Sequence, residues 1–316
     1  MPMTRASGGF TLAELAVALV IMALLFAGAL IPLSTQIEVR NIADTQRTVD
    51  HIREAVIGFA MANGRLPCPA RGQTPAGETD SITWSPTSIA AGSEQWDPAN
   101  NRCFVVFGVV PWATLGVPEA DAWGRRFTYR VSHAFADAIS LASHQSLASP
   151  ALVPPNAALM SPANQSPSCS PTPAPTLASF ALCSLGDIAV YNRNESSHAR
   201  TTIGSALPAV VISHGRNGYG AFQPGGTRVV GSGDGDGDGV PDQNADEAAN
   251  VSGSTTLTPY AGSFSQWAFY SRSPMSASTG CSDGTAGSPL CEFDDIVFML
   301  SSSTLMARIV SAGRLP

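Results

Sequence analysis

The sequence predicts an α+β protein in which a long N-terminal helix packs on an antiparallel β-sheet head with long loops. Three observations support this fold class. Residues 10–33 are almost entirely apolar, and residues 34–62 repeat apolar side chains at helical spacing. Residues 63–316, here called the head, alternate short runs rich in Val, Ile, Phe and Tyr with stretches rich in Gly, Pro and Ser, a pattern typical of strands and loops.

The apolar segment at residues 10–33 carries one acid near its start, Glu14, and the next charge is Glu38. The 23 uncharged residues between these acids would form about 34 Å of helix, enough to cross a bilayer core of about 30 Å. We therefore expect residues 10–33 to span a membrane. A lone acid at the centre of such a helix would cost about 2.5 to 3.5 kcal/mol, so Glu14 requires a place near the interface or a cationic partner.

A conventional secretory signal is the alternative, and residues 27–29 offer a small-residue cleavage site for it. The apolar run is longer than the core of an ordinary signal, however, and it continues into an amphipathic pattern without a turn. In residues 34–62 the apolar positions fall on one helical face, with charged residues between them, so the helix should lay this face on the head. The apolar positions are Ile42, Val49, Ile52, Val56 and Phe59. The run NGRLPCP at residues 63–69 should end the helix.

The head contains six candidate strands and two candidate helices. The strands are expected at residues 104–110, 126–132, 187–191, 209–213, 266–271 and 295–300, and the helices at residues 132–144 and 301–313. The proline-rich segment at residues 149–176 indicates an exposed irregular loop within one domain.

Composition limits the classes of function. At 316 residues and 44% hydrophobic content, the chain can form a substantial core. The formal net charge is −7, and all 17 basic residues are arginines without a basic cluster, so the sequence has no nucleic-acid footprint.

Six cysteines form an even, widely spaced set without a Cys-x-x-Cys pair. In a chain that leaves the cytoplasm, this pattern indicates disulfides rather than a zinc site. We expect each cysteine to pair with its neighbour in sequence, because each such bond would close a loop rich in Pro, Ser or Gly. The expected pairs are Cys68–Cys103, Cys169–Cys183 and Cys281–Cys291. The alternative is that some of the cysteines are buried free thiols.

The run GFTLAEL at residues 9–15, followed by an apolar helix, resembles the class III signal of type IV pilins and type II secretion pseudopilins. The resemblance implies that a prepilin peptidase cuts between Gly9 and Phe10 and methylates the new N-terminal Phe10. It also implies that Glu14 pairs with the Phe10 amine of a neighbouring subunit during assembly. The chain would then have a leader at residues 1–9, a helix at 10–62 and a pilin-like head at 63–316.

By this resemblance the protein is a structural subunit of a type IV pilus or type II secretion pseudopilus, and not an enzyme. Its partners would be the prepilin peptidase, other pilin or pseudopilin subunits, and an inner-membrane assembly platform. It would be a single-pass inner-membrane protein with a periplasmic head before assembly, and part of the filament afterwards. The alternatives are a secreted or membrane-anchored calcium-binding adhesin, and an anchored hydrolase whose Ser, His and Asp are brought together by folding.

Two segments of the head also resemble this family. DAWGRRFTYRV at residues 121–131 is similar to a signature of the major type II secretion pseudopilin. SHGRNGYG and FDDIVFML are similar to that family's calcium-binding loop, which places Asn217 and Asp295 at two ligand positions. The chain departs from the family in having Asn at the first position and in the long separation of the two. Taken alone, Asp294 and Asp295 are more typical of an exposed strand edge than of a site.

A second candidate calcium site follows from the residues alone. In GDGDGDGVPDQNADE, four aspartates and one carbonyl occupy the positions of a D-x-D-x-D-G calcium loop, and the closing acid comes one residue late. The candidate ligands are Asp234, Asp236, Asp238, the Val240 carbonyl, Asp242 and Asp246. The alternative is a solvated acidic loop without a bound ion.

Catalytic motifs are absent from the sequence. There is no P-loop and no G-x-S-x-G, and the five histidines lack metal-binding spacing, so we expect them at surface or turn positions. The five are His51, His133, His144, His198 and His214.

Overall fold

The computed structural model describes residues 11–80, 88–98, 102–136, 186–230, 244–252, 254–260, 264–275 and 280–313. The chain forms two compact units, Met1–Asp44 and Thr45–Pro316. Several predictions lie outside the described residues: the leader at 1–9 with the cleavage position at Gly9 and Phe10, the part of the expected helix 132–144 after Ala136 with His144, the irregular loop at 149–176, the pair Cys169–Cys183, and the acidic loop at 234–242.

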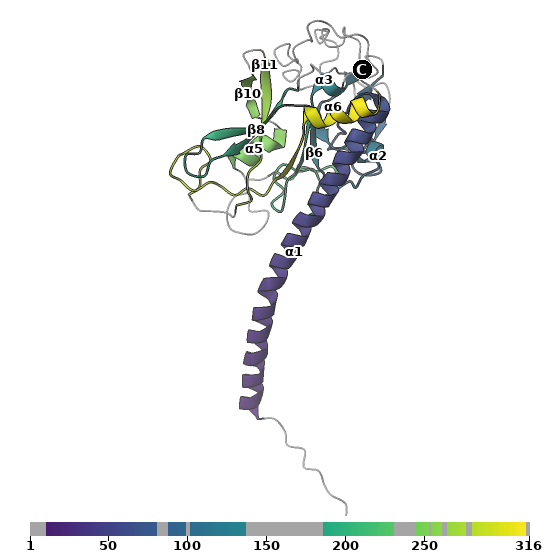
Figure 1. Ribbon diagram of the computed structural model, residues 1–316. Coiled ribbons are helices and arrows are strands. Elements are labelled where there is room, and N and C mark those ends of the chain that lie inside the picture. Colours follow the sequence, from purple (N-terminus) through teal and green to yellow (C-terminus); the bar gives the residue numbers. More distant parts are fainter. Residues whose placement is uncertain are drawn as a thin grey trace, which may run out of the picture. The chain divides into compact units, whose positions relative to one another are not determined.

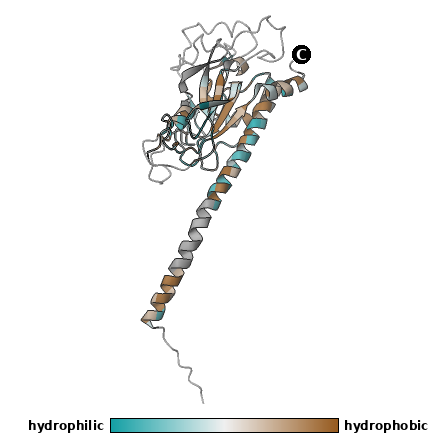
Figure 2. Ribbon diagram, turned by 60° about the vertical axis from the view of Figure 1, so that its left-hand side comes forward, coloured by the Kyte–Doolittle hydropathy of each residue, from teal (hydrophilic) through white to brown (hydrophobic). Residues whose placement is uncertain are grey.

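The first unit contains the N-terminal part of helix α1 (Leu12–Asn63), which begins with a reciprocal cap. The Thr11 amide and hydroxyl both donate to Glu14 Oε2 at 2.9 Å, and the Thr11 hydroxyl accepts from the Glu14 amide at 3.2 Å. The following turns expose apolar side chains, coloured brown in Figure 2, including Leu12, Leu15, Val17 and Leu19. We expected residues 10–33 to span a membrane. Among the described residues, no helix combines the length and the apolar character needed to cross one.

The C-terminal part of α1 belongs to the second unit and contributes to its core. Val49, Ile52 and Val56 are buried, as their spacing predicts, and Ile57 and Ala60 are buried beside them. The helix ends at Asn63, and the following Gly64 adopts a left-handed conformation (φ +72°) and donates its amide to the Ala60 carbonyl at 2.8 Å.

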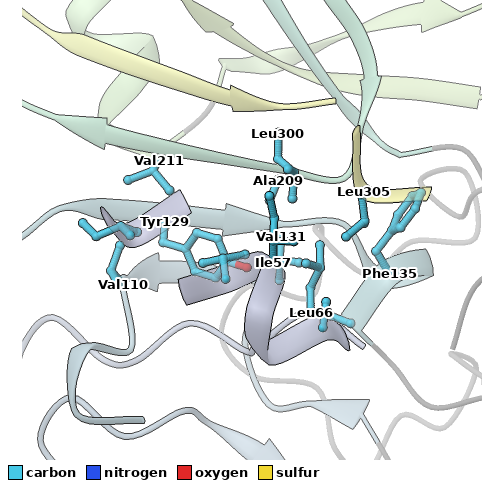
Figure 3. Close-up of a cluster of buried hydrophobic side chains, with 14 of the residues drawn as sticks. Ile57, Leu66, Val110, Tyr129, Val131, Phe135, Ala209, Val211, Leu300 and Leu305 are labelled. Carbon is cyan, nitrogen blue, oxygen red and sulfur yellow. The ribbon is translucent and has the colours of Figure 1, made fainter. Parts of the chain in front are cut away.

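The first sheet has four antiparallel strands in the order β12, β9, β6, β5. The strands are β5 (Phe107–Val109), β6 (Thr128–Val131), β9 (Ala209–Ser213) and β12 (Ile296–Leu300). Alternate residues of β6 and β9 face α1 and α6 (Ser302–Ser311) across a shared core. Figure 3 shows Tyr129, Val131 and Val211 of this sheet around Ile57 of α1, with Leu305 of α6 beside Phe135.

The second sheet has the order β10, β11, β7, β8. The strands are β7 (Ile188–Arg193), β8 (Arg200–Leu207), β10 (Ser254–Tyr260) and β11 (Phe264–Tyr270). The sheets are antiparallel, as expected, except that β11 pairs with β7 in parallel. A parallel pair needs a long crossover, and β8, β9, α5 and β10 all intervene in sequence between β7 and β11.

The two sheets pack against each other, and helix α5 (Ala245–Ser252) covers the outer face of the second sheet (Figure 1). Val210 and Ile212 of β9 point away from α1 into a cluster with Ile188 and Phe269. On the outer face, Ala249 of α5 packs in a cluster with residues of β7 and β11. The second unit therefore has four layers: α1 with α6, the first sheet, the second sheet, and α5.

Six expected strands correspond to β5, β6, β7, β9, β11 and β12, and the expected C-terminal helix is α6, capped by the Ser301 side chain. The sequence prediction missed β8, α5 and β10. Shorter elements complete the described residues: α2 (Trp112–Leu115), α3 (His133–Ala136), β1 (Thr79–Asp80), β2 (Ile89–Ala90), β3 (Trp96–Asp97) and β4 (Arg102–Cys103). The predicted disulfides Cys68–Cys103 and Cys281–Cys291 are both present.

Candidate metal centre

Three carboxylates meet where α5 approaches the start of β12. Glu247 comes from the first turn of α5, and Asp294 and Asp295 immediately precede β12. One oxygen of each lies within 4.8 Å of the others, and Glu247 and Asp295 are buried. We call these three residues the acidic centre.

Asparagine side chains hold the acidic centre in place. Asn244 caps α5 by accepting the Asp246 and Glu247 amides at 3.1 and 2.9 Å, and its Nδ2 donates to Glu247 Oε2 at 2.7 Å. Asn250, one turn further along α5, donates to Asp295 Oδ2 at 2.7 Å. The helix cap therefore also orients a carboxylate of the centre.

The loop after β9 closes the other side. Asn217 donates its amide nitrogen to Asp294 Oδ2 at 2.7 Å and its side-chain Nδ2 to Glu247 Oε2 at 3.1 Å. The turn leaves no space for a side chain at Gly215 (φ +53°), where a Cβ would lie 2.4 Å from the Asp294 carbonyl oxygen. Arg125 Nη1 donates to the carbonyls of Gly215 and Arg216 at 2.7 and 2.6 Å, so the segment 121–131 fixes this loop.

Neutral side-chain donors reach the acidic centre from Asn217, Asn244 and Asn250. Arg193 and Arg272 instead pair with Asp246, and Arg272 also pairs with Asp283. His214 Nδ1 lies 3.5 Å from Asp295 Oδ1, and Asp294 Oδ1 and Asp295 Oδ1 are buried without a hydrogen-bond partner. Two carboxylate oxygens are thus shielded from water with no donor to satisfy them.

The energetic consequence appears in the pKa values. Burial, followed by the charges of Asp295 and Asp294, raises the pKa of Glu247 to about 10. Burial and the charge of Asp295 raise the pKa of Asp294 to about 8. A divalent cation at the centre would favour the ionised carboxylates and reverse both shifts. Carboxylate oxygens are the ligands that calcium prefers, so the donor set fits a hard cation.

Comparison with known proteins identifies a motif at the N-terminus of the chain. A family model described as the prokaryotic N-terminal methylation motif matches residues 4–30. The chain carries this methylation motif. The match includes Gly9, Phe10 and Glu14 and is consistent with the type IV pilin and pseudopilin family. No curated protein and no solved structure matches the chain, so the similarity of the head to the major pseudopilin stays a prediction.

Within the methylation motif, the structure places Glu14 in the cap of its own helix. Its carboxylate accepts two hydrogen bonds from Thr11, one position after Phe10. Sequence reasoning considered Glu14 only as a partner of another subunit and missed this local role, although the T-x-x-E spacing of a capping box marks it.

The candidate metal ligands separate into three groups. Asp295 belongs to the acidic centre. Asn217, far from it in sequence, donates hydrogen bonds to Asp294 and Glu247 of that centre. Asp246 lies in α5 and binds Arg193, with Arg193 Nε donating at 2.9 Å. The other five candidates, Asp234, Asp236, Asp238, Val240 and Asp242, lie outside the described residues.

Three expectations about individual residues are wrong, and one of them concerns His198, which is only 6% exposed. Asp295 is not an exposed strand edge, because it is only 5% exposed. His214 is fully buried, and its Nε2 lies 2.7 Å from the Thr128 hydroxyl, with Asp295 near its other ring nitrogen. Thr128 is itself buried in β6, a central strand paired with β5 and β9, so substrate cannot reach this hydroxyl as it would a hydrolase nucleophile.

Sequence reasoning missed Glu247. The sequence does contain one local signal for it. Asn244, three residues earlier, is a typical helix N-cap residue, and a helix that starts there has Glu247 in its first turn.

Proposed function

We propose that the protein is a pilin-like structural subunit of a type IV pilus or type II secretion pseudopilus. In this proposal it polymerises through α1 after prepilin peptidase cuts between Gly9 and Phe10. The observation that carries the proposal is the methylation motif at residues 4–30. Its partners are the peptidase, other pilin or pseudopilin subunits, and an inner-membrane assembly platform, and its role is structural rather than enzymatic.

The exposed start of α1 supports polymerisation. Leu12, Leu15 and Val17 are each more than half exposed, and burying such side chains against a lipid or a neighbouring helix is favourable. We propose that this segment is held in the inner membrane with the head in the periplasm, and that it then enters the filament. Glu14 would exchange its Thr11 hydrogen bonds for the cationic Phe10 amine of a neighbouring subunit.

We also propose that the head binds calcium at the acidic centre. Supporting this are three converging carboxylates, two buried oxygens without donors, and carboxylate pKa values raised by burial and then by mutual repulsion. A buried carboxylate cluster without a counter-charge destabilises a fold, and a bound cation removes that penalty. The aspartate loop at residues 234–242 is a second candidate site.

Mass spectrometry of the N-terminus in the native host tests the subunit class. We expect a mature chain that begins at methylated Phe10. A chain that begins at Leu30 would instead establish conventional secretion and leave the calcium-binding adhesin as the proposed function.

The assembly role of Glu14 is tested with Glu14→Ala, which should be cleaved and folded but excluded from filaments. Glu38→Ala, the next acid along α1, is the matched control and should assemble. Normal polymerisation of Glu14→Ala would contradict the charge-pairing role.

Thermal unfolding of the full chain in calcium and in chelator tests the metal site. Calcium should raise the melting temperature, because a ligand that binds only the folded state stabilises it. Glu247→Gln should remove the rise if the acidic centre binds calcium. The double substitution Asp236→Ala with Asp238→Ala should remove it if the aspartate loop does. A rise that survives Glu247→Gln but not the double substitution contradicts the acidic centre.

A further inference from the structure

The disulfide Cys281–Cys291 closes a loop that contacts helix α5. Asp283 of this loop is buried, and its Oδ1 accepts the Cys291 amide at 3.1 Å. Its Oδ2 accepts the Asp246 amide at 3.3 Å, so it shares with Asn244 the task of capping α5. The loop therefore holds the helix end from which Glu247 projects.

Arg272, which follows β11, ties the same loop to α5 and to the backbone before β12. Its Nη2 donates to the carbonyls of Cys291 and Glu292 at 2.8 and 3.1 Å and lies 3.3 Å from Asp283 Oδ1. Its Nε lies 3.5 Å from Asp246 Oδ2. The side chain is only 3% exposed, so these contacts are made out of water.

One carbonyl connects this cluster to the acidic centre. The Glu292 carbonyl accepts from Arg272 and also from Asn244 Nδ2, at 2.7 Å, and Asn244 Nδ2 lies within 2.7 Å of Glu247 Oε2. Two residues after Glu292, the Asp294 amide donates to Glu247 Oε1 at 3.0 Å. The disulfide is thus joined to the centre through the backbone of residues 291–294 and through the cap of α5.

We propose that the Cys281–Cys291 disulfide holds the acidic centre in its cation-binding arrangement, so that reduction of this bond lowers the affinity of the centre for calcium. This inference rests on the proposed calcium site. Reduction by a dithiol breaks the S–S bond and leaves two cysteine thiols, while the dithiol becomes the oxidised disulfide. The opened loop no longer holds Asp283 against Arg272 and α5, so calcium must reorder these groups when it binds, and that ordering is subtracted from the binding free energy.

Coupling between two sites is reciprocal. If the intact disulfide favours calcium binding, bound calcium must favour the intact disulfide by the same factor. The protein would then bind calcium fully only after oxidation, and calcium would protect the bond against reductants.

Calorimetric titration of the full chain with calcium chloride measures the effect of the disulfide on calcium affinity. Cys281→Ser with Cys291→Ser should weaken binding by about tenfold, within the usual range of coupling between sites. Cys68→Ser with Cys103→Ser is the matched control, because that disulfide lies in the core around α1, and it should change affinity by less than about twofold.

Reduction of the unsubstituted chain measures the effect of bound calcium on the disulfide. This experiment does not require the serine variants to fold. Dithiothreitol treatment, alkylation and mass spectrometry follow the Cys281–Cys291 bond in calcium and in chelator. At saturating calcium, the equilibrium ratio of reduced to intact Cys281–Cys291 bond should fall by the same factor, about tenfold, and Glu247→Gln should remove this protection.

Equal opening in calcium and in chelator, in a chain that binds calcium, would overturn the coupling and leave the metal site intact. A chain that shows no calcium binding in the titration would overturn the proposed metal site and this inference with it.

Discussion

Asp246 and Glu247 are consecutive residues of α5, both fully buried, in opposite electrostatic surroundings. Asp246 faces Arg193, whose pKa is raised by their hydrogen bond, and Arg272 at 3.5 Å. Burial still raises the pKa of Asp246, but both arginines oppose that shift. Glu247 faces Asp294 and Asp295, and it accepts hydrogen bonds from the side-chain amides of Asn217 and Asn244. Consecutive helical side chains project about 100° apart, so one short helix serves both surroundings.

The difference shows that burial alone does not explain the acidic centre. The fold neutralises one carboxylate with arginine and leaves its neighbour in a cluster of like charge. Removing one partner of a buried ion pair is costly, whereas relieving repulsion between buried like charges is not. Substitutions of Asp246 and of Glu247 should therefore change the free energy of unfolding differently. The following predictions run from the largest effect to the smallest.

Asp246→Ala should lower the free energy of unfolding by about 3–5 kcal/mol, because it leaves the half-buried Arg193 and the buried Arg272 without this counter-charge. Urea denaturation in chelator measures the change. A loss below about 1 kcal/mol would show that the arginine side is no more stabilising than a surface pair.

Glu247→Gln should not lower the free energy of unfolding in chelator, because folded Glu247 holds a proton at a cost to stability at neutral pH, whereas glutamine is neutral in both states. In calcium at a hundredfold excess over Kd, it should lack the stabilisation of about 2.7 kcal/mol that a bound ligand provides. Parallel denaturation curves with and without calcium give both values. Destabilisation in chelator as large as that of Asp246→Ala would remove the distinction between the two sides.

The raised pKa of Glu247 predicts a pH dependence in chelator. The unfolded side chain ionises near pH 4.3, whereas the folded one has a pKa of about 10, so the folded state keeps a proton that the unfolded state has released. Stability is therefore present below the unfolded pKa and falls as pH rises, by up to about 1.4 kcal/mol per pH unit for this proton.

Denaturation at about pH 6 and about pH 8 measures this slope. Calcium should flatten it by keeping the carboxylates ionised, and Glu247→Gln should reduce it. Stability that rises with pH in chelator would contradict the assignment.

Arg308→Ala breaks an exposed ion pair and serves as the comparison for the ion pairs of Asp246. Arg308 Nη2 lies 3.7 Å from Glu54 Oε2, and both side chains are more than half exposed. Solvent screening should limit the loss of unfolding free energy to below about 1 kcal/mol, and urea denaturation at low and high salt measures it. A loss comparable to that of Asp246→Ala would mean that burial is not what distinguishes the two pairs.

The sequence by itself determined the features that depend on neighbours along the chain. Apolar spacing predicted the buried positions Val49, Ile52 and Val56 of α1, and a β-rich run predicted β9 with its observed ends. Pairing of neighbouring cysteines predicted the two described disulfides. These features follow from local periodicity and short loop closure, which the order of residues records directly.

Only the tertiary structure decided which acids converge. The aspartate spacing pointed to Asp246 as a ligand, but packing of α5 directs Asp246 to Arg193 and Arg272 and Glu247 to residues 294–295. Helix α5 packs on β11, which pairs in parallel with β7, the strand that carries Arg193. Hydrogen bonds from Asn250 to Asp295 and from the Asp294 amide to Glu247 join α5 to residues 294–295. Whether a buried carboxylate is neutralised depends on the sum of charges around it in space, and that sum has no local signature in the sequence.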